Sequence, residues 1–462
     1  MLAMSVSIAR KIAFEVLVRV AEQGAYADEA LRGALGRSVR REDAGLATEL
    51  TFGVLRWQRL LDFLVDRHLA KAGKSLDVEV RIALRLGAYQ LYFLERVPAR
   101  AAVHESVELV KVARKRSAAP LVNAVLRKAA KEAGAKGSAT EIVAGLLPAE
   151  LPAAERLGIL HSHPTWMVAR WLRAFGEART ETLLGANNRV PALAAYFLAE
   201  HREEALAALQ KSGCAVRPGR LLREAVILEG GNPSESDVAR RGWVAIQDEA
   251  SQCVALLVGV DPGNSVLDLC AAPGGKTLRL AMDAGAGGHV IAADLHANRV
   301  RAMAERFEGA GLRNVESMVV DGTRALPFAN KFDRILVDAP CSGTGTLARH
   351  PEIRWRIREQ DLADLHGRQV LLVRNSLAGL AVGGRLVYST CSLEQEENED
   401  VIGEALRESG GTYQLLSARG AIAGVLQESV SVDRVVGEDG FFRTFPGEEE
   451  TDGFFGGVVA RA

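Results

Sequence analysis

The stretch DLCAAPGGKT, residues 268–277, has the residue types of a loop that binds a phosphate or a nucleoside. Its last three residues, GKT, are those that end a P-loop, but Cys270 stands where the first glycine of a P-loop belongs. Because that glycine permits the backbone turn around the phosphates, the sequence argues against a bound nucleoside triphosphate. Gly274 and Gly275 still allow the backbone to approach a ligand closely at the start of a helix.

Two aspartates extend this pattern toward an adenosyl ligand. Asp294 closes the apolar run HVIAAD about 19 residues after Gly275, which is where Rossmann-like sheets bind the ribose hydroxyls. Asp321 follows the next apolar run, VESMVV, and is placed to accept a hydrogen bond from the amino group of an adenine. We therefore expect S-adenosylmethionine as the cofactor. A dinucleotide is the alternative, because glycine-rich turns between a strand and a helix are not specific.

Two cysteines follow apolar runs at the ends of predicted strands, Cys341 in VDAPCSGTG and Cys391 in VYSTCSLEQEENE. Two thiols at neighbouring strand ends are difficult to explain as small buried hydrophobes alone, so we expect reduced and reactive thiols here. For Cys214 and Cys253 we expect the ordinary role of a small buried hydrophobe. The five cysteines include no CxxC pair, so we expect neither a disulfide framework nor a metal site.

After residue 260 short apolar runs alternate with segments of helix length, a pattern that predicts a doubly wound, mostly parallel sheet. The runs are SVLDLC, HVIAAD, VESMVV, FDRILVDAP and GRLVYSTC. Ligands of such sheets bind beyond the carboxyl ends of the strands, and the cofactor loop and both cysteines lie at those ends. We therefore expect a C-terminal α/β Rossmann-like domain over 241–462. The acidic runs EQEENED and GEEETD are interpreted as solvated faces.

The first 135 residues predict a different kind of domain. Apolar residues such as Ile12, Val16 and Val20 recur at helical spacing, so we expect an all-helical bundle over 1–135. This part carries 23 Lys and Arg against 15 Asp and Glu, a net charge of +8, whereas the rest of the chain carries −9. A basic module suggests a polyanionic partner such as nucleic acid, although a solvated helical surface has a similar composition.

The region between these two domains has a mixed pattern. Residues 131–152 are rich in Ala, Gly and Pro, which is typical of a linker. Residues 155–240 predict a small α/β domain, because the helical stretch WMVARWLRAFG is followed by the short apolar runs ALAAYFLA and EAVILEG. The fold class is therefore multidomain. No run is long enough to cross a bilayer, so we expect a cytoplasmic protein without a membrane partner, and a monomer.

The motifs DLCAAPGGKT, DAPCSGTG and YSTCSLEQEENE, in this order and spacing, resemble the RNA cytosine-5 methyltransferases. The flanking VAIQDEASQ (244–252), RHPEIRW (349–355) and DGFF (452–455) are similar to the bacterial subfamily of the RsmB/Sun type, which modifies 16S ribosomal RNA. In the first third, ELTFGVLRWQRLLDFLVDRHL and LVNAVLRK resemble the NusB-like RNA-binding domain of that subfamily. The resemblance covers nearly the whole chain.

This resemblance implies transfer of a methyl group from S-adenosylmethionine to carbon 5 of a cytosine in 16S ribosomal RNA. It assigns to Cys391 the attack on carbon 6 and to Cys341 a part in product release. It also implies Lys276 as the cation that favours the Cys391 thiolate, and Asp338 as the group that binds N3 and N4 of the cytosine. The implied cofactor-binding residues are Cys270, Ala271, Ala272, Pro273, Gly274, Gly275, Lys276, Asp294, Asp321 and Asp338.

Three other functions remain open from the sequence. The first is that of a transfer RNA methyltransferase. The second is that of a NusB-like RNA-binding protein whose methyltransferase half is inactive, and the third is that of a nucleotide triphosphatase or an RNA helicase accessory factor. The presence of both cysteines, Lys276 and Asp338 argues against the second, and Cys270 argues against the third.

Two basic stretches are predicted to contact RNA. Arg349, His350 and Arg354 follow the Cys341 motif along the chain, and we expect them to contact phosphates rather than to form a solvated face. Given the resemblance, the run KVARKR (111–116), on a predicted helix of the basic domain, is also expected to contact RNA, whereas without the resemblance a solvated face is favoured.

Overall fold

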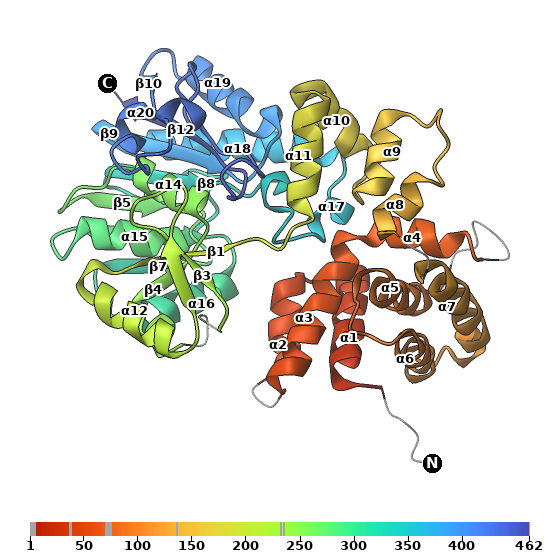
Figure 1. Ribbon diagram of the computed structural model, residues 1–462. Coiled ribbons are helices and arrows are strands. Elements are labelled where there is room, and N and C mark those ends of the chain that lie inside the picture. The colour runs from red at the N-terminus through yellow and green to blue at the C-terminus, as the bar shows by residue number, and fades with distance from the viewer. Residues whose placement is uncertain are drawn as a thin grey trace. The chain divides into compact units, whose positions relative to one another are not determined.

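A computed structural model describes residues 6–36, 39–69, 76–134, 137–231, 233 and 236–461 of the chain (Figure 1). The chain divides into two compact units. The first contains Met1–Arg189 together with Leu347–Arg356, and we call it the helical unit. The second contains Val190–Thr346 and Ile357–Ala462, and we call it the sheet unit.

The first part of the helical unit is the predicted all-helical bundle, which is thereby confirmed. Its helices are α1 (Ile8–Gln23), α2 (Ala27–Leu35), α3 (Arg41–Arg56), α4 (Gln58–Asp66), α5 (Val78–Phe93), α6 (Ala99–Val112) and α7 (Ala119–Ala133).

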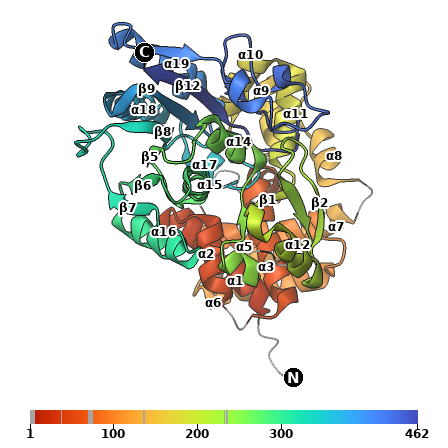
Figure 2. The same cartoon turned by 90° about the vertical axis from the view of Figure 1, so that its left-hand side faces the viewer.

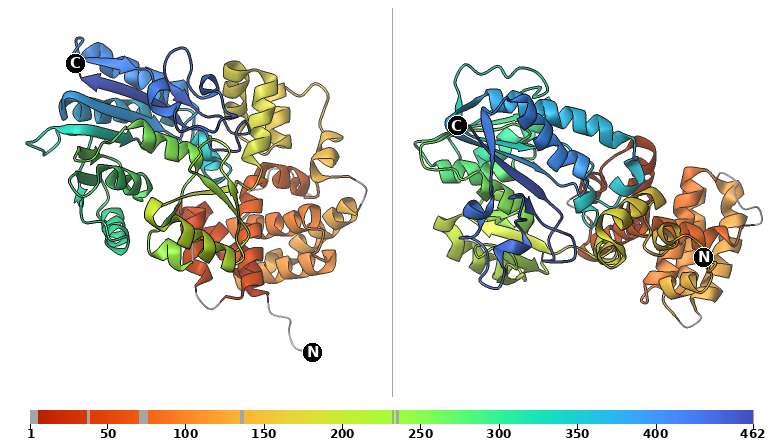
Figure 3. Two further views of the ribbon diagram at one scale, coloured as in Figure 1. Left: turned by 60° about the vertical axis from the view of Figure 1, so that its left-hand side comes forward. Right: turned by 90° about the horizontal axis from the view of Figure 1, so that it is seen from above.

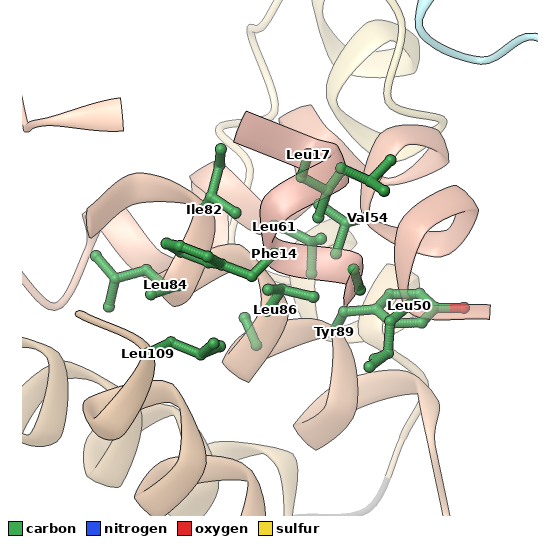
Figure 4. Close-up of a cluster of buried hydrophobic side chains, with 14 of the residues drawn as sticks. Phe14, Leu17, Leu50, Val54, Leu61, Ile82, Leu84, Leu86, Tyr89 and Leu109 are labelled. Atoms are coloured by element: carbon green, nitrogen blue, oxygen red, sulfur yellow. The ribbon is translucent and has the colours of Figure 1, made fainter. Parts of the chain in front are cut away.

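The core of this bundle forms because each helix buries the apolar positions that recur at helical spacing. Gly53 in α3 lies against the ring of Tyr89 in α5, and a Cβ atom at Gly53 would lie 2.0 Å from that ring. Only glycine therefore allows α3 and α5 to pack this closely. The side chains of the core include Phe14, Leu17, Leu50, Val54, Leu61, Ile82, Leu84, Leu86, Tyr89 and Leu109 (Figure 4).

Further helices complete the helical unit: α8 (Ala139–Ala144), α9 (Ala153–Leu160), α10 (Thr165–Phe175), α11 (Glu177–Asn187) and α17 (Ile353–Arg356). Ser138 and Glu141 form a capping box at the start of α8, which satisfies two backbone N–H groups reciprocally. The prediction of a linker over 131–152 is therefore wrong where the chain forms α8. The small-domain boundary expected at residue 155 also differs from the compact units, which group α9, α10 and α11 with the helices.

The small α/β domain predicted from two apolar runs is confirmed by a four-stranded antiparallel sheet in the sheet unit. Its strand order is β2-β3-β1-β4. The runs ALAAYFLA and EAVILEG become the adjacent strands β1 and β3. The elements are β1 (Leu193–Phe197), α12 (Arg202–Lys211), β2 (Ala215–Pro218), β3 (Val226–Glu229), α13 (Asp237–Arg240) and β4 (Val244–Ile246).

The second sheet of this unit has the strand order β10-β12-β9-β8-β5-β6-β7, with β11 paired to β12. The five predicted runs are its parallel strands: β5 (Ser265–Asp268), β6 (His289–Asp294), β7 (Val315–Val319), β8 (Phe332–Asp338) and β9 (Leu380–Thr390). An antiparallel end that the sequence did not predict consists of β10 (Tyr413–Leu416), β11 (Phe442–Arg443) and β12 (Phe455–Arg461).

Helices cover both faces of this sheet because alternate residues of each central strand are buried on opposite sides. In β8, Leu336 belongs to one apolar cluster, whereas Ile335 and Val337 belong to another. The first cluster includes side chains of α14 (Glu249–Leu257), α15 (Gly275–Ala284) and α20 (Arg419–Ile422), and the second includes those of α18 (Asp361–Ala378) and α19 (Glu399–Glu408). Helices α14, α15, α18 and α19 are labelled beside the sheet in Figure 2, and Figure 3 shows the same ribbon from two further sides. This arrangement is the predicted Rossmann-like, doubly wound domain.

Within the described part of the chain, no helix is long and apolar enough to cross a membrane. The same residues contain no group of three or more His, Cys, Asp or Glu side chains arranged to hold a metal ion.

Candidate active site

The predicted cofactor loop connects β5 to α15 at the carboxyl edge of the parallel sheet. Gly274 ends the loop with φ = 91°, a conformation that favours glycine, and a Cβ atom there would lie 2.8 Å from the ring of Phe307 in α16 (Ala297–Gly309). The loop is attached to β6 by a backbone hydrogen bond, because the N–H of Ala271 donates to the carbonyl of Ala293 at 2.9 Å. The N-terminus of α15 therefore begins directly at the glycine pair, as the sequence predicted.

Asp294 lies beside this loop, at the end of β6. Its Oδ1 accepts the N–H of His296 at 3.0 Å, and its Oδ2 lies 3.4 Å from the N–H of Ala272 in the loop. Asp321 follows β7 and accepts both the N–H and the hydroxyl of Thr323, and these hydrogen bonds lower the pKa of Asp321. Because β5, β6 and β7 are neighbours in the sheet, the structure brings the loop and both aspartates to one edge.

Asp268 is a buried acid of this site to which the sequence assigned no role. Its Oδ2 accepts the hydroxyl of Thr277 at 2.7 Å, whereas its Oδ1 has no hydrogen-bond partner among the described residues. Burial raises the pKa of Asp268 to about 7. The signal in the sequence is an acid that ends an otherwise apolar strand.

Lys276 and Asp338 join the cofactor loop to the end of β8. The Lys276 ammonium lies 2.7 Å from Oδ2 of Asp338, and the hydroxyl of Ser389 donates to Oδ1 of Asp338 at 2.7 Å. The same ammonium lies 5.2 Å from the ring centroid of Phe454, in the predicted DGFF motif. The positive charge of Lys276 is thus paired with the carboxylate of Asp338. That Lys276 favours the thiolate form of Cys391 stays a prediction.

The two cysteines predicted at neighbouring strand ends meet. Parallel pairing of β8 with β9 places Asp338 opposite Ser389, and the chain continues from these residues to Cys341 and Cys391. The two Sγ atoms lie 3.3 Å apart, and both cysteines are half-buried. The hydrogen bond with Cys391, burial and the charge of Glu397 raise the pKa of Cys341 well above its ordinary value, so this thiol keeps its proton at neutral pH.

The segments that flank the thiols are closely packed. The N–H of Gly345 donates to the carbonyl of Cys391 at 2.9 Å, and the N–H of Gly453 donates to the carbonyl of Gly345 at 2.8 Å. A Cβ atom at Gly345 would lie 2.1 Å from the carbonyl oxygen of Gly453, so this contact requires glycine. Asp248, from the VAIQDEASQ motif, accepts the N–H of Asp452 at 3.2 Å. The motifs DLCAAPGGKT, VAIQDEASQ, DAPCSGTG, YSTCSLEQEENE and DGFF therefore meet in this unit, whereas RHPEIRW belongs to the helical unit.

The remaining cysteines do not belong to the pair. Cys214 and Cys253 are buried, as predicted, and burial raises the pKa of Cys253. Cys270, in the cofactor loop, packs its side chain against the apolar cluster on one face of the sheet, and burial raises the pKa of its thiol too. Cys270 is nevertheless only half-buried, and the expectation that its backbone binds the cofactor stays a prediction.

The prediction that Arg354 contacts RNA phosphates is wrong. Its side chain is 0% exposed and lies inside the helical unit. The guanidinium donates to Oδ1 of Asn188 at 2.9 Å, to the carbonyl of Asn187 at 3.0 Å and to the carbonyl of Ser162 at 3.2 Å. Both terminal nitrogens of the guanidinium are thus bound by protein oxygens, whereas Nε has no partner among the described residues. Arg354 is therefore a buried structural residue. The phosphate contacts expected of Arg349 and His350 remain predictions.

The acidic run EQEENED was expected to be a solvated face, and this is wrong for part of it. Glu394, Glu397 and Asn398 are buried. Glu397 accepts hydrogen bonds from the segments that follow both cysteines.

The parallel sheet, the glycine-rich turn at its edge and the antiparallel β12 between β9 and β10 define a Rossmann-like methyltransferase domain, here in one chain with an all-helical bundle. Family comparisons agree with this class. The model described as "16S rRNA methyltransferase RsmB/F" matches residues 255–459, and the NusB family model matches residues 7–131. A model of the RsmF/B-like ferredoxin-like domain matches residues 163–235, a range that includes α10, α11 and the strands β1, β2 and β3 of the small sheet.

Curated relatives are similar over most of the chain. The probable ribosomal RNA small subunit methyltransferase B of Bacillus subtilis (strain 168) is 32% identical over 451 residues, which cover 96% of this chain and 97% of that protein. The ribosomal RNA small subunit methyltransferase B of Pseudomonas putida is 35% identical over 384 residues, 82% of this chain and 84% of the relative. The chain therefore belongs to the RsmB/F family of 16S ribosomal RNA methyltransferases.

Solved structures are similar as well. A methyltransferase homolog protein from Pyrococcus horikoshii has a TM-score of 0.56 and 27% identity, and the match covers 67% of this chain and 99% of that one. PH0851 has a TM-score of 0.81 and 23% identity over 99% of this chain and 100% of that one. At this identity the second match shows the fold alone.

Proposed function

We propose that this protein transfers a methyl group from S-adenosylmethionine to carbon 5 of a cytosine in 16S ribosomal RNA, through a covalent bond between Cys391 and carbon 6. The observation that carries this proposal is the 3.3 Å approach of the Cys341 and Cys391 thiols at the carboxyl edge of the sheet. The resemblance to RNA cytosine-5 methyltransferases assigns the order of the two thiols. Family membership supports the ribosomal RNA substrate, and transfer RNA is the alternative.

The residues at the loop fit an adenosyl cofactor. A Cβ atom at Gly274 would meet the side chains of Phe307 and Met303, so glycine allows the loop to pack against α16 while α15 begins at Gly275. The N-terminus of a helix favours a polar or negatively charged ligand group. We assign the carboxylate of Asp294 to the ribose hydroxyls and that of Asp321 to the adenine amino group. Asp268 ends the strand that leads into the same loop, and its buried Oδ1 has no hydrogen-bond partner among the described residues. When bound, S-adenosylmethionine supplies an electrophilic methyl group.

Carbon 5 of cytosine is a weak nucleophile, and the addition of a thiolate to carbon 6 makes carbon 5 more nucleophilic. The Cys391 thiolate forms a bond to carbon 6, and the electron pair of the 5,6 double bond then becomes available at carbon 5. Carbon 5 bonds to the methyl group while the bond between that group and the sulfonium sulfur breaks, so that S-adenosylhomocysteine would leave. Carbon 5 then loses its proton to a base. The electron pair of that C–H bond restores the double bond, and the C6–S bond breaks with Cys391 leaving as a thiolate.

Cys341 and Asp338 support these steps. The Cys341 thiol keeps its proton at neutral pH, so it donates a hydrogen bond to the Cys391 thiolate and stabilises it. We assign Cys341 to the release step because it contacts the sulfur that must leave. Asp338 is assigned to N3 and N4 of the cytosine, and its ion pair with Lys276 keeps the carboxylate in place. Such an enzyme would act in the cytoplasm, and we expect it to be a monomer.

Two single variants test this proposal. Cys391→Ala is expected to give neither methylation nor a covalent protein–RNA species. Cys341→Ala is expected to attack and to transfer methyl, and then to stall as a denaturant-resistant protein–RNA species that requires S-adenosylmethionine. Electrophoresis with radiolabelled 16S ribosomal RNA and, separately, transfer RNA measures both results and selects the substrate. A species trapped by Cys391→Ala and absent from Cys341→Ala would reverse the assignment. If neither variant forms the protein–RNA species, thiol addition would be excluded.

A further inference from the structure

The buried carboxylate of Glu397 connects the two segments that carry the thiols. Its side chain is 0% exposed, although it lies in an acidic run. Oε1 accepts the N–H of Ser342, the residue after Cys341, at 2.8 Å. Oε2 accepts the hydroxyl of Ser392, the residue after Cys391, at 2.5 Å. One carboxylate therefore binds the neighbours of both cysteines.

Asn398 holds Cys391 from both sides. Its Oδ1 accepts the hydroxyl of Thr390 at 2.5 Å, and its Nδ2 donates to the carbonyl of Ser392 at 3.0 Å. Thr390 and Ser392 are the residues directly before and after Cys391. A single buried amide therefore binds the hydroxyl of the residue before this thiol and the backbone carbonyl of the residue after it.

Gln369, from α18, completes the same arrangement around Cys341. Its Nε2 donates to Oε1 of Glu397 at 2.9 Å and to the carbonyl of Pro340 at 3.0 Å. Pro340 directly precedes Cys341. The hydroxyl of Tyr388 donates to the backbone carbonyl of Glu397 at 2.6 Å, which fixes the position of Glu397 itself.

From these contacts we propose that Glu397 and Asn398 are positioning residues that hold the thiols of Cys341 and Cys391 face to face. Glu397 acts on both cysteines and Asn398 on Cys391 alone. This inference rests on the proposed function, because it concerns the same two thiols. A buried carboxylate is costly unless it is paired or hydrogen-bonded, and Glu397 accepts from three donors that the thiol segments and α18 supply.

The charge of Glu397 adds a second effect. Its carboxylate contributes to the raised pKa of Cys341, after the hydrogen bond with Cys391 and burial. A negative charge near Cys341 disfavours a second negative charge on its sulfur. Position and charge can be separated, because Gln in place of Glu397 keeps the shape and can still accept from Ser342 and Gln369.

The test uses Glu397→Ala, Glu397→Gln and Asn398→Ala in the full chain. Asp400→Asn is the matched control, because Asp400 is an exposed acid three residues from Glu397. Two properties are measured: kcat and KM for RNA methylation, and the rates at which iodoacetamide alkylates each thiol, followed by peptide mass spectrometry. The alkylation rates do not depend on activity, so a failure of the proposed function is distinguished from a failure of this inference.

Glu397→Ala is expected to lower kcat by about a hundredfold with little change in KM, the size of effect that misplacing a reacting group by about 1 Å produces. Alkylation of Cys341 should become faster in both Glu397 variants, and Glu397→Gln should retain more of kcat. Asn398→Ala should change the alkylation rate of Cys391 and leave that of Cys341 as in the wild type.

Two results would overturn the inference. One is a wild-type kcat in Glu397→Ala. The other is a lower kcat with both alkylation rates unchanged, which indicates a purely structural role. If Glu397→Ala does not fold, Glu397→Gln is judged by the same two measurements.

Discussion

The Sγ atoms of Cys341 and Cys391 lie 3.3 Å apart, although 50 residues separate the two cysteines in the chain. Parallel pairing of β8 with β9 brings their strand ends together, and Glu397 connects the residues that follow them. The separation suits a hydrogen bond between sulfurs and exceeds a disulfide bond, about 2.05 Å, by roughly 1.2 Å. Small movements of two short loops would therefore join the thiols.

We predict that mild oxidation crosslinks this pair. Diamide, which takes up two hydrogen atoms, should convert Cys341 and Cys391 to a disulfide and remove two of the five titratable thiols of the unfolded protein. Methylation should be lost and should return with dithiothreitol. Mass spectrometry of peptides checks the bond directly. Cys391→Ala is the control, and equal thiol loss in this variant and the wild type would contradict the prediction.

Asp294 is predicted to contribute to cofactor affinity. If its carboxylate binds the ribose hydroxyls, Asp294→Ala should weaken S-adenosylmethionine binding by about 1–3 kcal/mol, because bound polar groups lose their partner. Isothermal calorimetry measures the dissociation constant. Glu305→Gln, an exposed acid on α16, is the control and should bind as the wild type does. Wild-type affinity in Asp294→Ala would remove this residue from the cofactor site.

The parallel strands and the cofactor loop could be predicted because their signals are local. Each of the strands β5 to β9 is a short apolar run, and Gly274 and Gly275 mark the turn that follows β5. The meeting of Cys341 with Cys391 follows only from the order of strands in the sheet. In the sequence the two thiols are equivalent, so nothing but the family resemblance separates their roles.

Arg354 shows why other features could not be predicted. The segment RHPEIRW is polar and follows the Cys341 motif, so its local composition indicates a surface. The helical unit instead encloses it: the guanidinium donates to the carbonyl of Ser162, and the Trp355 indole donates to the carbonyl of Leu55 at 3.0 Å. Contacts between residues so far apart in sequence leave no local pattern. They also mean that deleting residues 1–135 would leave buried groups of this segment without partners.

The acidic run after Cys391 was misinterpreted for a related reason. Its composition is that of a solvated face, but Glu397 and Asn398 bind backbone and hydroxyl groups of buried loops. A polar side chain satisfied by backbone groups cannot be distinguished in sequence from one satisfied by water. A single observation could have indicated burial, namely that the run directly follows a candidate nucleophile.

RNA affinity is predicted to depend on exposed cations of α7. Arg127, Lys128 and Lys131 are exposed on this helix. By contrast, Lys111 and Lys115 of the run KVARKR form ion pairs with Glu108 and Asp77, which reduces the charge they offer to RNA. We therefore expect the α7 residues to contribute more to RNA binding.

Reversing the three α7 charges to Glu should weaken RNA binding. It should also reduce the slope of log K against log salt by up to about 2, because each single-stranded phosphate contact contributes roughly 0.7. Filter binding at several salt concentrations measures both quantities. A swap that keeps the charge, Arg127→Lys with Lys128→Arg, is the control. An unchanged slope in the reversal variant would mean that this face does not contact RNA.

The last prediction concerns the stability of the helical unit at mildly acidic pH. His163 is fully buried there, with Nδ1 2.7 Å from the carbonyl of His161 and Nε2 3.2 Å from Nδ2 of Asn187. These contacts suit a neutral imidazole that donates from Nδ1 and accepts at Nε2. Burial, followed by the charge of Arg354, lowers the pKa of His163 well below its ordinary value.

The unfolded chain binds a proton at His163 near pH 6.5, whereas the folded chain does not. Stability is therefore fully present above pH 6.5 and should fall as the pH drops below it, by up to about 1.4 kcal/mol per pH unit. Urea denaturation at pH 7.5 and 5.5 measures the change through tryptophan fluorescence, to which Trp171, 5.8 Å from the His163 ring, contributes. His163→Gln should reduce this pH dependence, and His104→Gln, at an exposed position on α6, should leave it unchanged. Equal pH dependence in His163→Gln and the wild type would show that His163 does not titrate on unfolding.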